Sequence, residues 1–233
     1  MTILDVNNLE FNYGSSQILF NVSVKAKKGS ITCLMGSNGV GKTSLLKFLS
    51  GSINAISGKY LYNNKNVFNL PSHKLAQLGI SYVPQGRYIF PLLTVKENLE
   101  IGFVCLKKDN WFIPNEIFDL FPILKKMLDR KGGDLSGGQQ QQLAIARSLI
   151  TRPNLLLMDE PTEGIQPSII KQIGEVILYL KKEKKMTIFL VEQYFDFAFG
   201  LSDYLYLMQR GKIIQEGARD KLDKKAFKKQ LSI

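Results

Sequence analysis

One short segment restricts the possible folds of this chain more than any other feature. Residues 36–43 read Gly-Ser-Asn-Gly-Val-Gly-Lys-Thr and fit the pattern GxxxxGK(S/T). An apolar run, Ile31–Met35, precedes the segment, and a helix-forming run, Lys42–Leu49, follows it. In this context glycines let successive backbone N–H groups point at phosphate oxygens, and the start of the helix adds partial positive charge. The segment therefore predicts a nucleotide phosphate site on a strand–loop–helix unit.

Side-chain chemistry suggests separate roles within this loop. Lys42 is expected to reach the β- and γ-phosphates as a point charge, and the Thr43 hydroxyl is expected to ligate Mg²⁺. The remaining candidates for contact with the nucleotide are Gly36, Ser37, Asn38, Gly39, Gly41 and Ser44.

A second candidate group lies where an apolar run ends in two carboxylates. Residues 155–158 are Leu-Leu-Leu-Met, and Asp159 and Glu160 follow. Alone, such a pattern also fits a helix cap. Burying two charges beside a strand is costly unless they face a site. Together with the phosphate loop, the pattern predicts that Asp159 holds Mg²⁺, directly or through water, and that Glu160 orients or deprotonates the attacking water.

A third motif, Leu135-Ser136-Gly137-Gly138-Gln139, precedes the helical run Gly137–Ile150. Ser136 and Gln139 have the spacing of a capping box. A cap does not explain two glycines in the first turn, because glycine is a poor helix former. The glycines would let backbone N–H groups approach an anion closely.

Strand-like and helical runs alternate along most of the chain, which predicts a layered α/β core with a mostly parallel sheet. The strand-like runs are Ile31–Met35, Ile80–Val83, 155–158, 187–191 and 204–208, and the helical runs are Lys42–Leu49, Gly137–Ile150 and 167–182. Residues 3–13, 22–26 and 58–62 alternate like antiparallel strands. Residues 93–135 read as mostly helical, with Pro114 and Pro122 as breaks. We expect one domain over residues 1–233, with residues 1–92 and 140–233 as its core and about 93–139 as an inserted helical subdomain.

Composition narrows the functional classes. With 233 residues, no apolar run of about 18 residues and two cysteines without metal spacing, the chain is expected to be cytosolic and to lack a membrane span. Residues 1–10 lack the features of a secretory signal. The net charge of +11 fits either an anionic partner or lysine-rich solvated helix ends. Few aromatic residues accompany the lysine clusters, so no nucleic acid partner is expected.

The phosphate loop and the segment 135–139 together resemble the ATP-binding subunit of an ABC transporter, and the resemblance covers the whole chain. It implies the ABC ATPase form of the P-loop NTPase fold, with ATP and Mg²⁺ as cofactors. It assigns Tyr13 to stacking on adenine. It assigns Gln85 to contact with Mg²⁺ and the attacking water, and to coupling with a membrane subunit.

The resemblance also implies partners. Residues 135–139 would bind the γ-phosphate held by a second ATPase subunit, which is either another copy or a related chain. Two membrane permease subunits and a periplasmic binding protein would complete the transporter, with the ATPases at the cytoplasmic face of the membrane. Intact Lys42, Asp159 and Glu160 argue against a module that binds nucleotide without hydrolysing it.

Two positions depart from the usual family pattern. Gln193 stands where the family carries a histidine that touches the γ-phosphate, and Gln166 stands where it carries an inter-subunit aspartate. Gln193 can donate a hydrogen bond but cannot shuttle a proton, so we expect retained activity without pH dependence from that residue. The single histidine, His73, is expected on an exposed helix.

Both departures resemble the branch of importers for branched-chain amino acids and urea, as does the stretch 86–99. Residues 163–170, Glu-Gly-Ile-Gln-Pro-Ser-Ile-Ile, are most similar to the urea-importer subunit. We therefore expect urea as the cargo, with branched-chain amino acids as the alternative. A cassette protein that acts on nucleic acid or ribosomes is a more distant alternative. The apolar residues 90–93, between Arg87 and Lys96, either pack inside the helical part or receive a membrane subunit.

Overall fold

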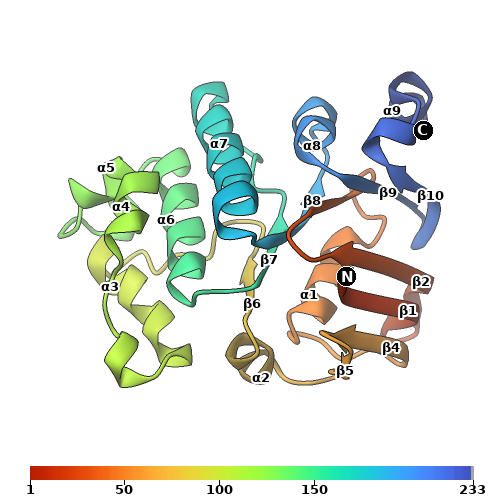
Figure 1. Ribbon diagram of the computed structural model, residues 1–233, viewed down its shortest axis with the longest axis horizontal. Helices are drawn as coiled ribbons and strands as arrows, with labels where there is room; N and C mark the ends of the chain where they lie inside the picture. Colours follow the sequence, from red (N-terminus) through yellow and green to blue (C-terminus); the bar gives the residue numbers. More distant parts are fainter. Residues whose placement is uncertain (232–233) are drawn as a thin grey trace.

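The computed structural model describes residues 1–231, and its larger sheet forms the frame of the molecule (Figure 1). This six-stranded sheet has the order β10-β9-β3-β8-β7-β6. All neighbours are parallel except the pair β9 and β10. The strands are β3 (Ile31–Met35), β6 (Ile80–Val83), β7 (Leu155–Asp159), β8 (Thr187–Glu192), β9 (Tyr204–Gln209) and β10 (Lys212–Ala218). Every residue of β3, β7 and β8 is buried, which explains their continuous apolar sequences.

A smaller, four-stranded antiparallel sheet has the order β2-β1-β4-β5. Its strands are β1 (Thr2–Tyr13), β2 (Ser16–Lys27), β4 (Ser57–Tyr62) and β5 (Lys65–Asn66). The alternation of residues along the sequence correctly predicted β1 and β4. It located only the second half of β2, because the first half of that strand includes exposed polar residues. β10 was not predicted, since alternately exposed residues along it weaken the apolar pattern.

Helices cover both faces of the larger sheet. α1 (Lys42–Leu49) contributes to the apolar cluster that also contains the smaller sheet, whereas α6 (Gly137–Ile150), α7 (Pro167–Lys184) and α8 (Phe195–Leu201) contribute to the cluster on the other face. Successive side chains of β3 point to opposite faces of the sheet, so Cys33 belongs to one cluster and Leu34 to the other. α2 (Ser72–Gln77) carries His73, which is exposed as expected. α9 (Lys224–Leu231) is the lysine-rich helix near the C-terminus.

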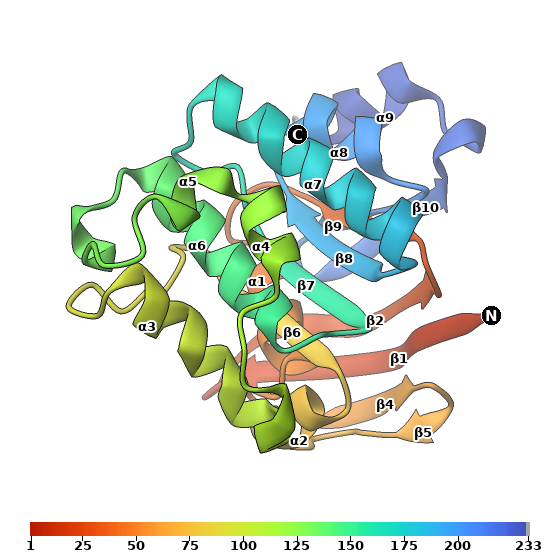
Figure 2. The ribbon, with the colours of Figure 1, turned by 60° about the vertical axis from the view of Figure 1, so that its left-hand side comes forward.

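Short helices gather around α6 at one end of the molecule, far from the smaller sheet (Figures 1 and 2). They are α3 (Val95–Glu100), α4 (Asn115–Leu120), α5 (Pro122–Lys125) and the 3-10 turns Ile101–Cys105, Lys108–Asn110 and Gly132–Asp134. A further 3-10 turn, Arg219–Lys221, follows β10. Pro114 and Pro122 stand at the beginnings of α4 and α5, where a missing N–H does no harm. No helix within residues 1–231 is long and apolar enough to cross a bilayer.

The buried side chain of Asn98 holds the segment 90–94 in place. Its Oδ1 accepts from the N–H of Phe90 at 2.8 Å, and its Nδ2 donates to the carbonyl oxygens of Phe90 and Thr94, both at 2.9 Å. With this anchor inside the protein, Phe90 remains 47% exposed and Leu92 80% exposed. Of the two interpretations of residues 90–93, packing inside the helical part is therefore wrong for Leu92, whereas the ring of Phe90 is half covered and packs against Arg147.

Replacing this anchor should destabilise the protein. In Asn98→Ala the N–H of Phe90 and the carbonyl oxygens of Phe90 and Thr94 lose the buried amide that holds them, so we expect the free energy of unfolding to fall by about 2–3 kcal/mol. Denaturant unfolding followed by circular dichroism measures this change. Lys96→Ala is the matched control on the same helix, because Lys96 is exposed and its 3.9 Å pair with Glu100 contributes little. Equal stability of the two variants would contradict the role of Asn98.

Candidate functional site

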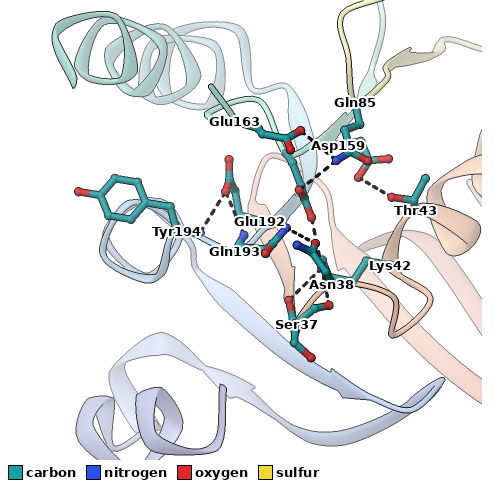
Figure 3. A network of polar contacts seen from close by, with 12 residues as sticks. Ser37, Asn38, Lys42, Thr43, Gln85, Asp159, Glu163, Glu192, Gln193 and Tyr194 are labelled. Carbon is teal, nitrogen blue, oxygen red and sulfur yellow. Dashed lines mark hydrogen bonds and ion pairs between the residues drawn. The ribbon is translucent and has the colours of Figure 1, made fainter. Parts of the chain in front are cut away.

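The loop between β3 and α1 curls around the ammonium group of Lys42 (Figure 3). Lys42 is only 4% exposed, and its Nζ donates to the carbonyl oxygens of Gly36 and Ser37, each at 2.9 Å. Gly41 has φ 110°, and a β-carbon there would lie 2.8 Å from the side chain of Leu19. Only glycine fits at this position, so packing and backbone conformation both explain its presence.

Asp159 ends β7 beside the first turn of α1. Its Oδ1 accepts from the Thr43 hydroxyl at 3.3 Å, and its Oδ2 accepts from the Tyr82 hydroxyl at 3.2 Å. Burial raises the pKa of the Asp159 carboxyl to about 6, although both hydrogen bonds act in the opposite direction. A hydroxyl and a carboxylate that already converge provide the hard oxygen ligands that Mg²⁺ prefers, so these two residues fit the ion.

Glu160 follows directly and forms a buried ion pair with Lys42. Its Oε1 lies 3.2 Å from Lys42 Nζ, and the two side chains are 5% and 4% exposed. Glu160 adopts φ 45°, a left-handed conformation that is rare outside glycine, and its N–H donates to the carbonyl of Val191 at 2.9 Å. Strained backbone of this kind persists where the surrounding structure holds a functional group in place. The carboxylate lies at the loop, where it meets Lys42.

Gln85 follows β6 and reaches the same carboxylates. Its Nε2 donates to Glu163 Oε2 at 2.9 Å and to Glu160 Oε2 at 3.3 Å. Gln85 thus contacts the carboxylate assigned to the attacking water, and Figure 3 shows its amide beside Glu163. Its partner Glu163, which the sequence analysis had not assigned a role, links this residue to the loop after β7.

Gln193, which directly follows β8, also reaches the phosphate loop. Its Nε2 donates to Asn38 Oδ1 at 2.5 Å, so the side chain that replaces the family histidine touches the loop directly. The preceding residue, Glu192, is buried and accepts hydrogen bonds from two separate segments. Burial raises the pKa of the Glu192 carboxyl above its ordinary value, and these hydrogen bonds oppose the rise.

A hollow of about 280 Å³ collects the residues assigned to one nucleotide. Tyr13, at the end of β1, is 48% exposed and packs edge-on against Phe11, so its ring can offer a face to a base. The hollow is lined by Tyr13, Ile18, Asn38, Gly39, Gly41, Lys42, Thr43, Ser44, Gln85 and Glu160.

Residues 135–139 do not line this hollow. Ser136 and Gln139 form both bonds of a capping box, at 3.4 Å and 2.9 Å, while Leu135 is buried. A β-carbon at Gly137 would lie 3.0 Å from Arg87 Nη1, and one at Gly138 would lie 3.0 Å from Ile169. Both glycines thus allow close approach of a neighbouring side chain, which at Gly137 is the flexible end of Arg87.

The segment 136–139 lines a second cleft, of about 910 Å³, with residues of α5 and α7. This cleft and the smaller hollow share no lining residue in the described part of the chain. One subunit therefore does not bring its glycine-rich segment to its own phosphate loop.

Three residues that contact the site were not predicted from the sequence: Glu192, Glu163 and Tyr82. Glu192 carried the same signal that identified Asp159 and Glu160, a carboxylate at the end of an apolar run. Tyr82 and Glu163 carry no comparable signal, because only the tertiary fold brings β6 beside the end of β7.

Residues 19–163 match the ABC transporter family. Among curated proteins, the chain is similar to the high-affinity branched-chain amino acid transport ATP-binding protein BraG of Pseudomonas aeruginosa, with 42% identity over 213 residues and 91% of each chain covered. It is also similar to the probable branched-chain amino acid transport ATP-binding protein LivF of Archaeoglobus fulgidus, with 39% identity over 225 residues, 95% of this chain and 94% of the relative.

Solved structures agree with this assignment. A nucleotide-free ATP-binding cassette from an ABC transporter has a TM-score of 0.85 and 30% identity, and covers 100% of this chain and 96% of its own. The ADP conformation of MJ1267, an ATP-binding cassette of an ABC transporter, has a TM-score of 0.84 and 31% identity, and the match covers 100% of this chain and 95% of that one. The predicted fold is confirmed. The chain belongs to the ABC transporter family, as an ATP-binding subunit that uses ATP and Mg²⁺ and couples ATP hydrolysis to transport.

Proposed function

We propose that this chain is the ATPase subunit of an importer for branched-chain amino acids. The convergence of Lys42, Asp159 and Glu160 on one loop is the observation that supports ATP hydrolysis. The curated relatives support the cargo, because BraG and LivF are both named as branched-chain amino acid transport ATP-binding proteins. This cargo was the alternative in the sequence analysis.

Urea is the second candidate cargo. Its support is the run 163–170, which resembles the urea-importer subunit, and none of the relatives described above is named for urea. Glu163 in that run contacts Gln85, so the run lies at the site that handles ATP. Contacts at this site can distinguish branches of the family, but they do not select a solute.

In the proposed reaction, water attacks the γ-phosphate of ATP to give ADP and phosphate. The loop N–H groups and Lys42 bind the triphosphate, and Tyr13 stacks on adenine. Glu160 orients or deprotonates the water, and the Gln193 amide donates a hydrogen bond to the terminal phosphate. Mg²⁺, held by Thr43 and Asp159 with Gln85 beside it, would offset the negative charge of the phosphate oxygens.

A second ATPase subunit completes each site in this proposal. Residues 135–139 line a cleft apart from the phosphate loop of their own chain, so their N–H groups are available to a nucleotide held by another subunit. Two subunits placed head to tail would enclose two ATP molecules. The second subunit is either a copy of this chain or a related one.

The partners in the membrane would contact the helical part, which we propose as a subdomain of residues about 93–139 beside a core of 1–92 and 140–233. Tyr88 is 68% exposed, Phe90 47% and Leu92 80%, and exposed apolar groups next to Gln85 suit a permease surface. We propose two permeases, an indirect periplasmic binding protein, and a position at the cytoplasmic face of the membrane.

Glu160→Gln tests the choice of the catalytic carboxylate. The amide keeps the shape of the side chain but cannot accept the proton of water, so kcat should fall by about 10²-fold or more while ATP still binds. Phosphate release measures the rate, and light scattering with ATP should show a stabilised dimer. Lys42→Ala is the control that should lose ATP affinity instead. Hydrolysis by Glu160→Gln at the parent rate would refute the assignment.

Gln193→His tests the role of the amide. A histidine with an ordinary pKa near 6.5 changes charge between about pH 5 and 8. The ratio of the variant rate to the parent rate should therefore depend on pH in this range, and the ratio for Gln193→Ala should not. Steady-state hydrolysis across the range gives both ratios. A flat ratio for the histidine variant would mean that residue 193 does not contact the reacting phosphate.

The cargo is tested by uptake in cells with and without this gene. We expect ATP-dependent uptake of labelled leucine to require the gene, and uptake of labelled urea to be unchanged. A strain that carries the Glu160→Gln variant controls for the presence of an inactive subunit. Gene-dependent uptake of urea alone would replace the amino-acid proposal with the urea one.

A further inference from the structure

Glu192 is a buried carboxylate to which the proposed reaction gives no role. It is the last residue of β8 and is 1% exposed. Its Oε1 accepts from the N–H and the hydroxyl of Thr162, at 3.1 Å and 2.8 Å. Its Oε2 accepts from the N–H groups of Gln193 and Tyr194, at 3.0 Å and 3.2 Å. A single side chain therefore joins two loops that leave neighbouring strands.

Each of these loops carries a group of the candidate site. Thr162 follows Glu160 with only Pro161 between them, and the ring of a proline fixes its φ. Gln193 extends its amide to Asn38 in the phosphate loop. Figure 3 shows Glu192 at the base of Gln193, with Lys42 and the phosphate loop beyond. A shift of either loop would thus be transmitted through Glu192 to the other.

The chemistry of this contact requires a carboxylate. Four donors converge on the side chain, and an ionised carboxylate is the group that accepts on both oxygens without donating. Within residues 1–231 no cation lies within 4.0 Å of its oxygens, so hydrogen bonds alone balance its burial. A hydrophobic residue would suffice if β8 needed only to be packed at this point.

We propose that Glu192 is a positioning residue for ATP hydrolysis, which fixes the loop of Glu160 relative to the loop of Gln193. The inference rests on the proposed roles of these two residues. It also gives the chain a connection between the nucleotide and residues 162–166, the segment in which Gln166 replaces the usual family aspartate.

Glu192→Gln separates the two halves of this contact. Two fixed N–H donors, of Gln193 and Tyr194, face one oxygen, whereas the other faces one N–H and the rotatable hydroxyl of Thr162, so the amide oxygen should face Gln193 and Tyr194. The new NH₂ group then faces Thr162, whose N–H loses its acceptor while its hydroxyl can rotate to accept. The variant should therefore lose the hydrogen bond that holds the loop of Glu160 and keep those to the N–H groups of Gln193 and Tyr194. Thr162→Val removes the hydroxyl bond from the other end and leaves the carboxylate in place.

Hydrolysis and nucleotide binding should respond differently in the full-length chain. Because small misplacements of reacting groups are costly, we expect kcat of Glu192→Gln to fall about 10- to 100-fold, with a smaller fall for Thr162→Val. ADP affinity, measured by calorimetry, should stay within about twofold, since ADP does not engage the terminal-phosphate groups. The double variant should lose less than the product of the two single losses, as expected for residues in one contact.

Asp203→Asn is the matched control. Asp203 also accepts a backbone hydrogen bond, from the N–H of Ile31 at 2.9 Å, but at the opposite end of the same sheet. This variant should change the melting temperature without changing kcat, which separates a loss of stability from a loss of positioning.

Several outcomes would overturn the inference. One is a kcat of Glu192→Gln within about twofold of the parent. Another is an ADP affinity that falls as far as kcat, which would indicate a purely structural role. If Glu192→Gln does not fold, parent-like hydrolysis by Thr162→Val is sufficient to reject the proposal. Glu160→Gln is measured in parallel, because an active Glu160→Gln would instead overturn the proposed function itself.

Discussion

The buried pair of Lys42 and Glu160 is the interaction on which the site depends. Two opposite charges 3.2 Å apart, each almost fully removed from water, carry a large desolvation cost that their mutual attraction offsets only in good geometry. The loop carbonyls complete the coordination of the ammonium, and Gln85 donates to the carboxylate. Removing one partner would leave an unpaired charge in the interior. Such a buried charge pair is expected at a site that binds a highly charged substrate.

The parallel sheet determines why these groups meet. β3, β8 and β7 are parallel neighbours in this order, so the phosphate loop, the carboxylates Asp159 and Glu160 at the end of β7, and the Glu192–Gln193 pair all lie at the same edge. These strands are buried on both faces and form a rigid base, and the loops that follow them supply the polar groups. Hydrogen bonds across this edge, including those of Asp159, Gln85 and Glu192, then fix the loops relative to each other.

Individual elements show where sequence reasoning works. Residues 31–49 combine an apolar strand, glycines and a helix-forming run, so local signals all agree and the unit was predicted correctly. β10 and the first half of β2 were not found, although each pairs with the strand just before it, because exposed residues interrupt their apolar pattern. The roles of Tyr82, Glu163 and Glu192 also went unnoticed, because each acts through a partner far away in the sequence or in a neighbouring loop.

By itself, the sequence determined the chemistry: a loop that suits phosphate, carboxylates beside it, and a capped, glycine-rich helix start. These features depend on residue type and short spacing, which a chain carries before it folds. Tertiary structure alone decided which groups meet. It joined Lys42 to Glu160, and Gln193 to Asn38. It also separated residues 135–139 from the phosphate loop of their own chain, because strand order and helix packing set distances that no local pattern encodes.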